Sequence, residues 1–392
     1  MAMPAARHTG HRPAPPALRA SLGAAAQSLR QPPSAQLRSS PKWRTDSAKR
    51  WAGTGPERQG PGRAALRGGA LRVREEGVER VVSEGEGEGD EEAGEVDFSQ
   101  GGWLWSNDAA AKTQAVLGAK RVRPKKSLGQ NFVTDDDVLT RVVQAANIQE
   151  GDLVLEVGPG TGNLTRYLLA AGATVTSVEK DHRLVDTLRA EFAQSPAFTL
   201  IEGDILRMDP MELAAGIRAA AGAPEGAAIK VVANLPYYIT TDVLKKYLPL
   251  GGAFSNLIFM LQEEVAQRFA IHMPGSRDYR YMSVYCRFFS RPEYKFRISR
   301  HLYFPKPKVD GAVVDFELLP PGERAAVASP EAFLSLVHGA FLHRRKMMKN
   351  SMALPSADVA DALSAAGLNP ESRAQDLSLD DFVAVHHQLE SK

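Results

Sequence analysis

The sequence has a single cysteine, Cys286, among 392 residues. An intramolecular disulfide framework is therefore excluded, and the composition fits a reducing compartment. Cys286 stands in the apolar, aromatic run of residues 281–289, which predicts a buried side chain rather than a nucleophile. No apolar run approaches the roughly 20 residues that a membrane-spanning helix needs, so we expect a soluble protein without membrane association.

Acidic residues are almost absent from residues 1–74, where Asp46 and Glu57 are the only two. The segment is rich in Ala, Arg, Pro, Ser and Gly, and it lacks the apolar core of a secretory signal. This composition is typical of organelle transit peptides, and a plain disordered basic tail is the alternative. The charge reverses after residue 74, and we interpret residues 75–119 as an acidic flexible linker.

The histidines that could bind a metal have no companion ligands in the sequence pattern. His301 and the pair His386 and His387 stand apart from any cysteine or carboxylate at a metal-ligand spacing. We interpret them as surface or core residues and predict no metal site.

A glycine turn at residues 158–162 follows an apolar run at residues 153–157, and an amphipathic segment follows at once. This pattern predicts a buried strand that turns tightly into a helix. Glycines let the backbone approach a ligand there, and the helix N-terminus offers unpaired N–H groups. The dinucleotide fingerprint requires a glycine at position 163, where this chain has Asn163. We interpret the turn as a cradle for another nucleotide-type cofactor, with an ordinary tight turn as the alternative.

Predicted strands and helices alternate through the middle of the chain. We expect strands at residues 153–157, 174–178, 199–204, 229–233 and 257–261, and helices at 135–146, 164–171, 184–192 and 262–271. This alternation predicts a parallel, doubly wound α/β sheet. Two later strands are expected at 296–298 and 312–318, and only helices from about residue 330. We place a Rossmann-like domain at residues 120–319 and a small all-helical domain at 320–392.

Three polar side chains follow predicted strands, namely Glu179, Asp204 and Asn234. Ligands of open parallel sheets bind beyond the carboxyl ends of the strands, and an acid about 20 residues after the glycine turn is placed to bind ribose hydroxyls. A helix N-cap or a surface carboxylate is the alternative for each residue alone. Their joint placement favours a cofactor site.

The segment Asn234–Tyr238 reads Asn-Leu-Pro-Tyr-Tyr and directly follows a predicted strand. Proline frees backbone carbonyls from ladder pairing, and the asparagine side chain adds a further acceptor. Two acceptors can hold an exocyclic amino group while an aromatic ring stacks on its base. This arrangement would position an amine against an electrophilic methyl group without a covalent nucleophile.

Seven motifs together resemble the small-subunit ribosomal RNA adenine dimethyltransferases of the KsgA type. They are Gln130–Phe132, Glu156–Gly162, Glu179–Asp181, Asn234–Tyr237, Met260–Val265, Phe304–Asp310 and His343–Met347. The resemblance is in order along the chain and covers residues of about 120 to 390. Three further segments most resemble the plastid branch of this family: Leu248–Gly251, Glu293–Arg297 and Leu379–Val383.

The resemblance implies S-adenosylmethionine as the cofactor of a methyltransferase fold. The implied contacts are Asn131 and the Val133 backbone at the entry, Gly158 and Gly160 at the methionine part, Glu179 at the ribose, and Asp204 and Ile205 at the adenine. Val133 stands where the family often has leucine, a small change for a backbone contact.

The same resemblance implies the residues that hold the target base. Asn234 and the Pro236 carbonyl would hold the adenine amino group, and Tyr237 would stack on the ring. Tyr238 departs from the small polar residue that the family often has, so its part in the second methylation is open.

Contacts with RNA are predicted from three basic runs. Arg344, Arg345, Lys346 and Lys349 are expected on a C-terminal helix, joined by Arg121–Lys126 and by Lys306 and Lys308. Such residues set affinity and position through phosphate contacts without reading sequence. A solvated helix face is the alternative for each run alone.

Together the patterns favour a monomeric, S-adenosylmethionine-dependent methyltransferase. By the resemblance, it would convert two adjacent adenosines near the 3′ end of small-subunit rRNA to N6,N6-dimethyladenosine, in the chloroplast or alternatively the mitochondrion. Three other functions stay open: a non-catalytic ribosome-assembly factor, an organelle transcription-factor-like relative, and an adenine methyltransferase that acts on tRNA or DNA.

Overall fold

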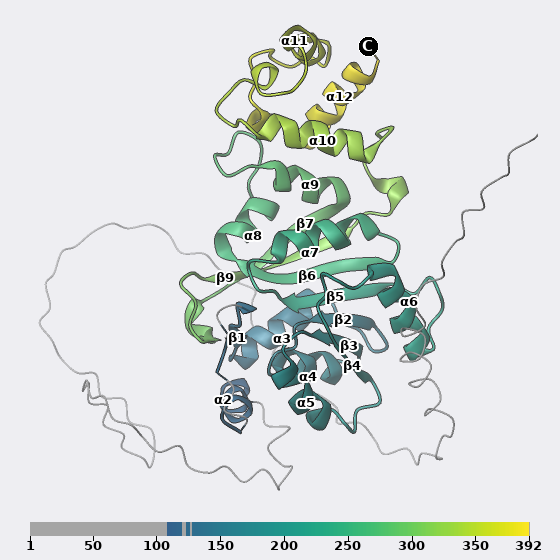
Figure 1. Cartoon of the computed structure of the whole chain (residues 1–392), viewed down its shortest axis with the longest axis vertical. Helices are drawn as coiled ribbons and strands as arrows, with labels where there is room; N and C mark the ends of the chain where they lie inside the picture. Colours follow the sequence, from purple (N-terminus) through teal and green to yellow (C-terminus); the bar gives the residue numbers. More distant parts are fainter. Residues whose placement is uncertain (1–107, 120–122, 126–127, 392) are drawn as a thin grey trace, which may run out of the picture. The chain divides into compact units, whose positions relative to one another are not determined.

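The computed structural model describes residues 108–119, 123–125 and 128–391 (Figure 1). The predicted transit peptide, residues 75–107 of the predicted linker, and residues 120–122 and 126–127 lie outside this part of the chain. The last two ranges include Arg121 and Lys126 of a predicted basic run. Element labels below follow Figure 1.

A seven-stranded mixed sheet carries the fold, with strand order β4-β3-β2-β5-β6-β9-β7. The strands are β2 (Leu153–Val157), β3 (Thr174–Glu179), β4 (Phe198–Glu202), β5 (Ile229–Asn234), β6 (Phe254–Gln262), β7 (Ser290–Ile298) and β9 (Gly311–Leu318). The five strands from β4 to β6 are parallel, as predicted, whereas β9 runs antiparallel to both β6 and β7. Residues 299–310 join β7 to β9 through a 3-10 turn and the short strand β8, without the crossover α-helix that usually connects parallel neighbours.

Alternate residues of the central strands face two different layers of helices. Leu153, Leu155 and Val157 pack in one hydrophobic cluster, while Val154 packs in another. The first cluster takes in α6 (Pro210–Ala221), α7 (Thr240–Tyr247) and α9 (Tyr281–Phe289), and the second takes in α3 (Asp136–Ala145) and α4 (Asn163–Ala170). A strand that is buried on both faces has an almost continuous apolar sequence, and β2 could be predicted from this pattern.

Aspartates cap three of the helices that surround the sheet. The Asp135 side chain accepts from the Val138 N–H at the start of α3, and Asp181 accepts from the Arg183 N–H at the start of α5 (His182–Glu191). Asp209 caps α6 in the same way. These side chains satisfy N–H groups that the helix itself leaves unpaired, and so they fix where each helix begins.

The aromatic run at residues 281–289 forms helix α9, an element that the sequence analysis did not assign. Cys286 is fully buried in it, as predicted, and burial raises the pKa of its thiol far above the usual value. Helix α8 (Glu263–Ala270) precedes α9 in the chain. No helix within the described ranges is long and apolar enough to cross a bilayer.

From Pro330 to residue 391 the regular elements are helices, as predicted: α10 (Pro330–Phe341), α11 (Ser356–Ala365) and α12 (Leu379–Glu390), with short 3-10 segments and turns between them. The core of this part of the chain is continuous with that of the sheet: the ring centres of Phe288 and Phe333 are 5.0 Å apart, and those of Tyr279 and Phe341 are 6.2 Å apart. Figure 1 shows α10 next to α9. The boundary between residues 319 and 320 stays a prediction.

Arg344, Arg345 and Lys346 after α10 are not on a helix, so this expectation was wrong for them. Helix α10 ends at Phe341; Arg344, Arg345 and Lys346 lie in turns, and Lys349 lies in a short 3-10 segment (Met348–Asn350). The buried Met348 donates its N–H to the Ser372 carbonyl at 2.9 Å. The Met348 side chain packs in the core, and this packing directs the chain away from the axis of α10. Tertiary contacts here override the helix propensity of the basic residues.

The end of the predicted flexible linker is helix α2 (Ala109–Ala119), so that expectation was also wrong for these residues. The Asp108 side chain accepts from the Ala111 N–H at 2.8 Å, which caps the helix. Val116 and Leu117 are buried against Phe132, Leu184 and their neighbours. Burial of these two apolar side chains stabilises the helix, whereas a polar linker would have no such side chains to bury.

Candidate functional site

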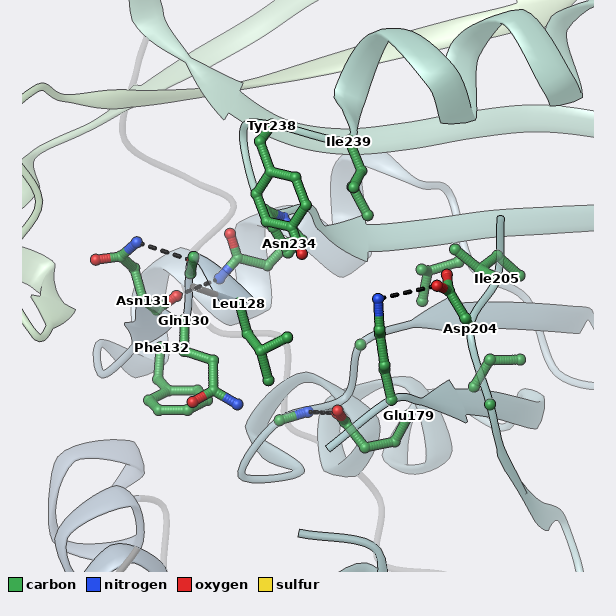
Figure 2. Close-up of a pocket in the computed structure, with 18 residues that line it drawn as sticks. Leu128, Gln130, Asn131, Phe132, Glu179, Asp204, Ile205, Asn234, Tyr238 and Ile239 are labelled. Atoms are coloured by element: carbon green, nitrogen blue, oxygen red, sulfur yellow. Dashed lines mark hydrogen bonds and ion pairs between the residues drawn. The ribbon is translucent and has the colours of Figure 1, made fainter. Parts of the chain in front are cut away.

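A cavity opens at the carboxyl ends of β2, β3 and β5, where the sequence analysis expected it. It is lined by Leu128, Gly129, Gln130, Asn131, Phe132, Val157, Gly158, Gly160, Val178, Glu179, Lys180, Gly203, Asp204, Ile205, Asn234, Pro236, Tyr238 and Ile239. Figure 2 shows Glu179, Asp204 and Asn234 around this one space, each from a different part of the sheet edge.

The glycine turn forms one wall of the cavity. Gly158 and Gly160 have φ values of 70° and 61°, a region that side chains disfavour. A Cβ on Gly160 would lie 2.7 Å from the Phe132 ring, whereas a Cβ on Gly158 would meet no atom within 4 Å. The space beside Gly158 is therefore room that a side chain would fill and that a ligand can use.

Glu179 ends β3 and is buried. Its carboxylate accepts from the Gly160 N–H at 3.1 Å and from the Asp181 N–H at 2.7 Å. Burial raises the pKa of Glu179 above its usual value, against the effect of these hydrogen bonds. The side chain thus ties the glycine turn to β3, and its remaining lone pairs can accept from a ligand hydroxyl.

Asp204 lies after β4 and forms an ion pair with Lys180 at 2.9 Å. It also accepts from the Leu206 N–H at 3.1 Å. Partial burial acts to raise the pKa of Asp204, but the bonds from Lys180 and Leu206 outweigh it and hold the pKa below its usual value. Ile205 is buried beside it and gives the cavity an apolar wall.

Asn234 ends β5 and is oriented by the segment that precedes α3. Its Nδ2 donates to the Asn131 carbonyl at 2.7 Å (Figure 2), which leaves Oδ1 as the acceptor available to a ligand. The Pro236 carbonyl accepts from the Ile239 N–H at 3.1 Å and keeps a second lone pair. Two acceptors from one motif are therefore held by the fold without a ligand present.

The two tyrosines of the motif line different cavities. Tyr238 is 56% exposed and lines the cavity of Asn234. Tyr237 lines a second cavity, together with Arg268, Arg280 and Arg344 and with residues of α7 to α10. Burial raises the pKa of the Tyr237 hydroxyl. The base-stacking role of Tyr237 stays a prediction, and the structure adds Tyr238 to the candidate site.

Val133 does not line the main cavity. Its side chain is buried in the core, and its carbonyl accepts from Asn163 Nδ2 at 2.9 Å. It lines a small neighbouring cavity with Glu156 and Asn234. Sequence reasoning missed the contribution of Lys180, which follows Glu179 in the quoted motif and could have been found there.

The donors and acceptors of the main cavity suit a nucleoside-type cofactor. It offers open space beside Gly158, a carboxylate on Glu179, and a polar and an apolar group at Asp204 and Ile205. Within the described residues, no group of three or more His, Cys, Asp or Glu side chains is placed to hold a metal ion.

Comparisons with known proteins give the chain a family. The sequence model of the family described as ribosomal RNA adenine dimethylase matches residues 121–391. A chloroplastic ribosomal RNA small subunit methyltransferase of Arabidopsis thaliana is 40% identical over 288 residues, covering 72% of this chain and 84% of that protein. Ribosomal RNA small subunit methyltransferase A of Protochlamydia amoebophila is 37% identical over 284 residues, covering 72% and 96%.

Solved structures confirm the fold. A dimethyladenosine transferase from Plasmodium falciparum superimposes with a TM-score of 0.54 at 20% identity, covering 66% of this chain and 98% of that one. The 23S rRNA methyltransferase ErmE superimposes with a TM-score of 0.52 at 24% identity, covering 66% of this chain and 99% of that one.

The family model matches residues 121–391, and the two relatives in sequence match most of their own lengths. These matches show that this chain is a member of the ribosomal RNA adenine dimethylase family.

Proposed function

We propose that this protein dimethylates N6 of two adjacent adenosines near the 3′ end of small-subunit rRNA, with S-adenosylmethionine as the methyl donor. The observation that carries the proposal is Asn234, whose side chain is fixed by the Asn131 carbonyl beside the cavity of Glu179 and Asp204. An amide oxygen held there can accept a hydrogen bond from the amino group of adenine, the base that the description of the matching family names.

The cofactor would lie along the main cavity. Asn131 would line its entry, Gly158 and Gly160 its methionine part, Glu179 its ribose, and Asp204 and Ile205 its adenine. The Val133 backbone, also implied by the resemblance, lies outside this cavity and binds Asn163 instead. When bound, it supplies a methyl carbon whose bond to sulfur breaks as the bond to the adenine nitrogen forms. Because both carboxylates already accept backbone N–H groups, the site is organised before the cofactor enters.

Asn234 Oδ1 and the Pro236 carbonyl would hold the target amino group and orient its lone pair. Tyr237 would stack on the base, and Tyr238 is the other candidate because its ring lines the cavity of Asn234. Tyr237→Ala and Tyr238→Ala separate the two roles. The variant that lacks the stacking ring should lose methyl transfer but still bind S-adenosylmethionine. The other variant should keep most of its activity.

The basic residues after α10 would contact rRNA phosphates. Arg345 and Lys346 are exposed, and Arg344 lines the same cavity as Tyr237, so positive charge lies beside the catalytic motif. Lys349 would add a fourth contact. Phosphate contacts there would position the RNA, while the Asn234 motif selects the base.

The decisive experiment is methylation of unmodified small subunits by the full chain, read by primer extension. Dimethyladenine blocks Watson–Crick pairing, so reverse transcriptase should stop at two adjacent positions near the rRNA 3′ end. Asn234→Ala should remove the stops and keep S-adenosylmethionine binding, while Asn369→Ala, an exposed asparagine, should change neither. Binding of rRNA without stops would instead support a non-catalytic assembly factor.

We also propose that the protein acts in the chloroplast as a monomer. The acid-poor segment 1–74 and the chloroplastic relative support the location. A fusion of residues 1–74 to a fluorescent reporter should enter plastids; import into mitochondria would overturn the assignment.

A further inference from the structure

Helix α2 lies before the residues that the family model matches, yet it contacts the glycine turn. Asn163, the first residue of α4, donates from Nδ2 to the Ala109 carbonyl at 3.1 Å and to Thr113 Oγ1 at 2.9 Å. Thr113 Oγ1 also lies 3.4 Å from Thr161 Oγ1 within the turn. The two residues that flank Gly162 are thus held by contacts with α2.

These contacts are shielded from water. Thr113 is fully buried, and Thr161 and Asn163 are nearly so. Buried hydrogen bonds are not exchanged for bonds to water, and loss of one partner strands the other. The turn therefore depends on α2 for polar partners that solvent does not replace.

Helix α2 is itself anchored on two other helices. Lys112 forms a buried ion pair with Glu191 at the end of α5, and its ammonium lies 5.4 Å from the centre of the Phe192 ring. The Ala109 N–H donates to Asp136 of α3 at 3.3 Å. These anchors make α2 a fixed support rather than a loosely attached segment.

We propose that α2 is a positioning element that holds the glycine turn in the geometry that binds the cofactor, and that the mature chain therefore begins before Asp108. The proposal rests on the placement of S-adenosylmethionine at this turn, as given under the proposed function. Thr113 acts through Thr161 and Asn163 and touches no residue of the main cavity in any contact described above.

The test uses full-chain variants and calorimetry of S-adenosylmethionine binding without RNA. Thr113→Val removes the hydroxyl and keeps the shape, so the dissociation constant should rise about fivefold, the effect of one net hydrogen bond. Thr113→Ser should restore tight binding, and Gln114→Ala, on the exposed side of α2, should leave it unchanged. Thermal unfolding without ligand measures stability separately.

A Thr113→Val protein with lowered thermal stability but unchanged affinity would overturn the proposal, since α2 would then be only a packing element. Glu179→Ala, measured alongside, tests the placement of the cofactor itself. If Glu179→Ala loses affinity and Thr113→Val does not, the inference about α2 alone has failed. The processing boundary is checked by mass spectrometry of the chain purified from its organelle: an N-terminus after residue 108 would contradict it.

Discussion

Glu156 gives the sharpest test of the electrostatics behind this site. It lies in β2 directly before the glycine turn and is fully buried. Its Oε2 accepts from the hydroxyls of Thr165 and Ser177, each at 2.7 Å. Burial raises the pKa of this carboxyl from its ordinary 4.5 to about 7, with the two hydroxyls acting against the rise. We predict that Glu156→Gln stabilises the protein at pH 8.

The magnitude follows from the difference between these two pKa values. At about 1.4 kcal/mol for each pH unit, the rise from 4.5 to about 7 corresponds to about 3 kcal/mol. The folded protein retains this proton to a higher pH than the unfolded chain does. The free energy of unfolding therefore falls as the pH rises from about 4.5 to about 7, and it stays at the lower value above that. Glutamine carries no such proton.

Urea unfolding of both proteins, followed by circular dichroism from pH 4.5 to 8, measures the difference directly. Glu156→Gln should match the natural protein near pH 4.5 and exceed it by up to about 3 kcal/mol at pH 8. Titrating groups that do not interact with Glu156 contribute equally to both proteins, so their contributions cancel in the difference. Glu150→Gln, at an exposed position, is the matched control. A difference that does not change with pH would refute the reasoning.

Four further outcomes are expected. Gly160→Ala should lower the free energy of unfolding by about 1–3 kcal/mol, because its φ of 61° and the Phe132 ring both oppose a Cβ; an unchanged melting temperature would argue against this. Glu179→Ala should weaken S-adenosylmethionine binding by about 1–3 kcal/mol in calorimetry, and equal affinity would remove it from the site. Arg345→Ala should reduce the salt slope of rRNA binding by about one, and an unaltered slope would exclude a phosphate contact. Cys286 should react with an aromatic disulfide only after unfolding, since its thiol is fully buried.

The central strands could be predicted from sequence because burial on both faces leaves a strong pattern. Residues 153–157 are apolar at four of five positions, and the structure buries all five. Helix α9 could not be found in the same way. Its Tyr, Val, Cys and Phe residues have modest helix propensity, and packing against α8 and α10 decides their conformation. The antiparallel direction of β9 is likewise set by its partners rather than by its own residues.

The convergence of Glu179, Asp204 and Asn234 could be predicted because the carboxyl ends of parallel neighbours share one edge of the sheet. The orientations of the Tyr237 and Tyr238 side chains could not be predicted from the sequence. They are adjacent residues in a turn, and only the backbone conformation there decides which ring enters which cavity. The support that α2 gives to Asn163 was also hidden, because 50 residues separate it from Thr113.

The sheet and the C-terminal helices share one hydrophobic core, so this enzyme cannot be divided between them into two independently folding fragments. Phe333 packs on Phe288 of α9, and Phe341 packs on Tyr279, so a cut at residue 319 would expose aromatic surfaces on both pieces. Neither piece would be an interchangeable module. Substitutions in α12 that loosen this packing should therefore lower protein abundance before they weaken RNA binding, since the two halves share one hydrophobic core.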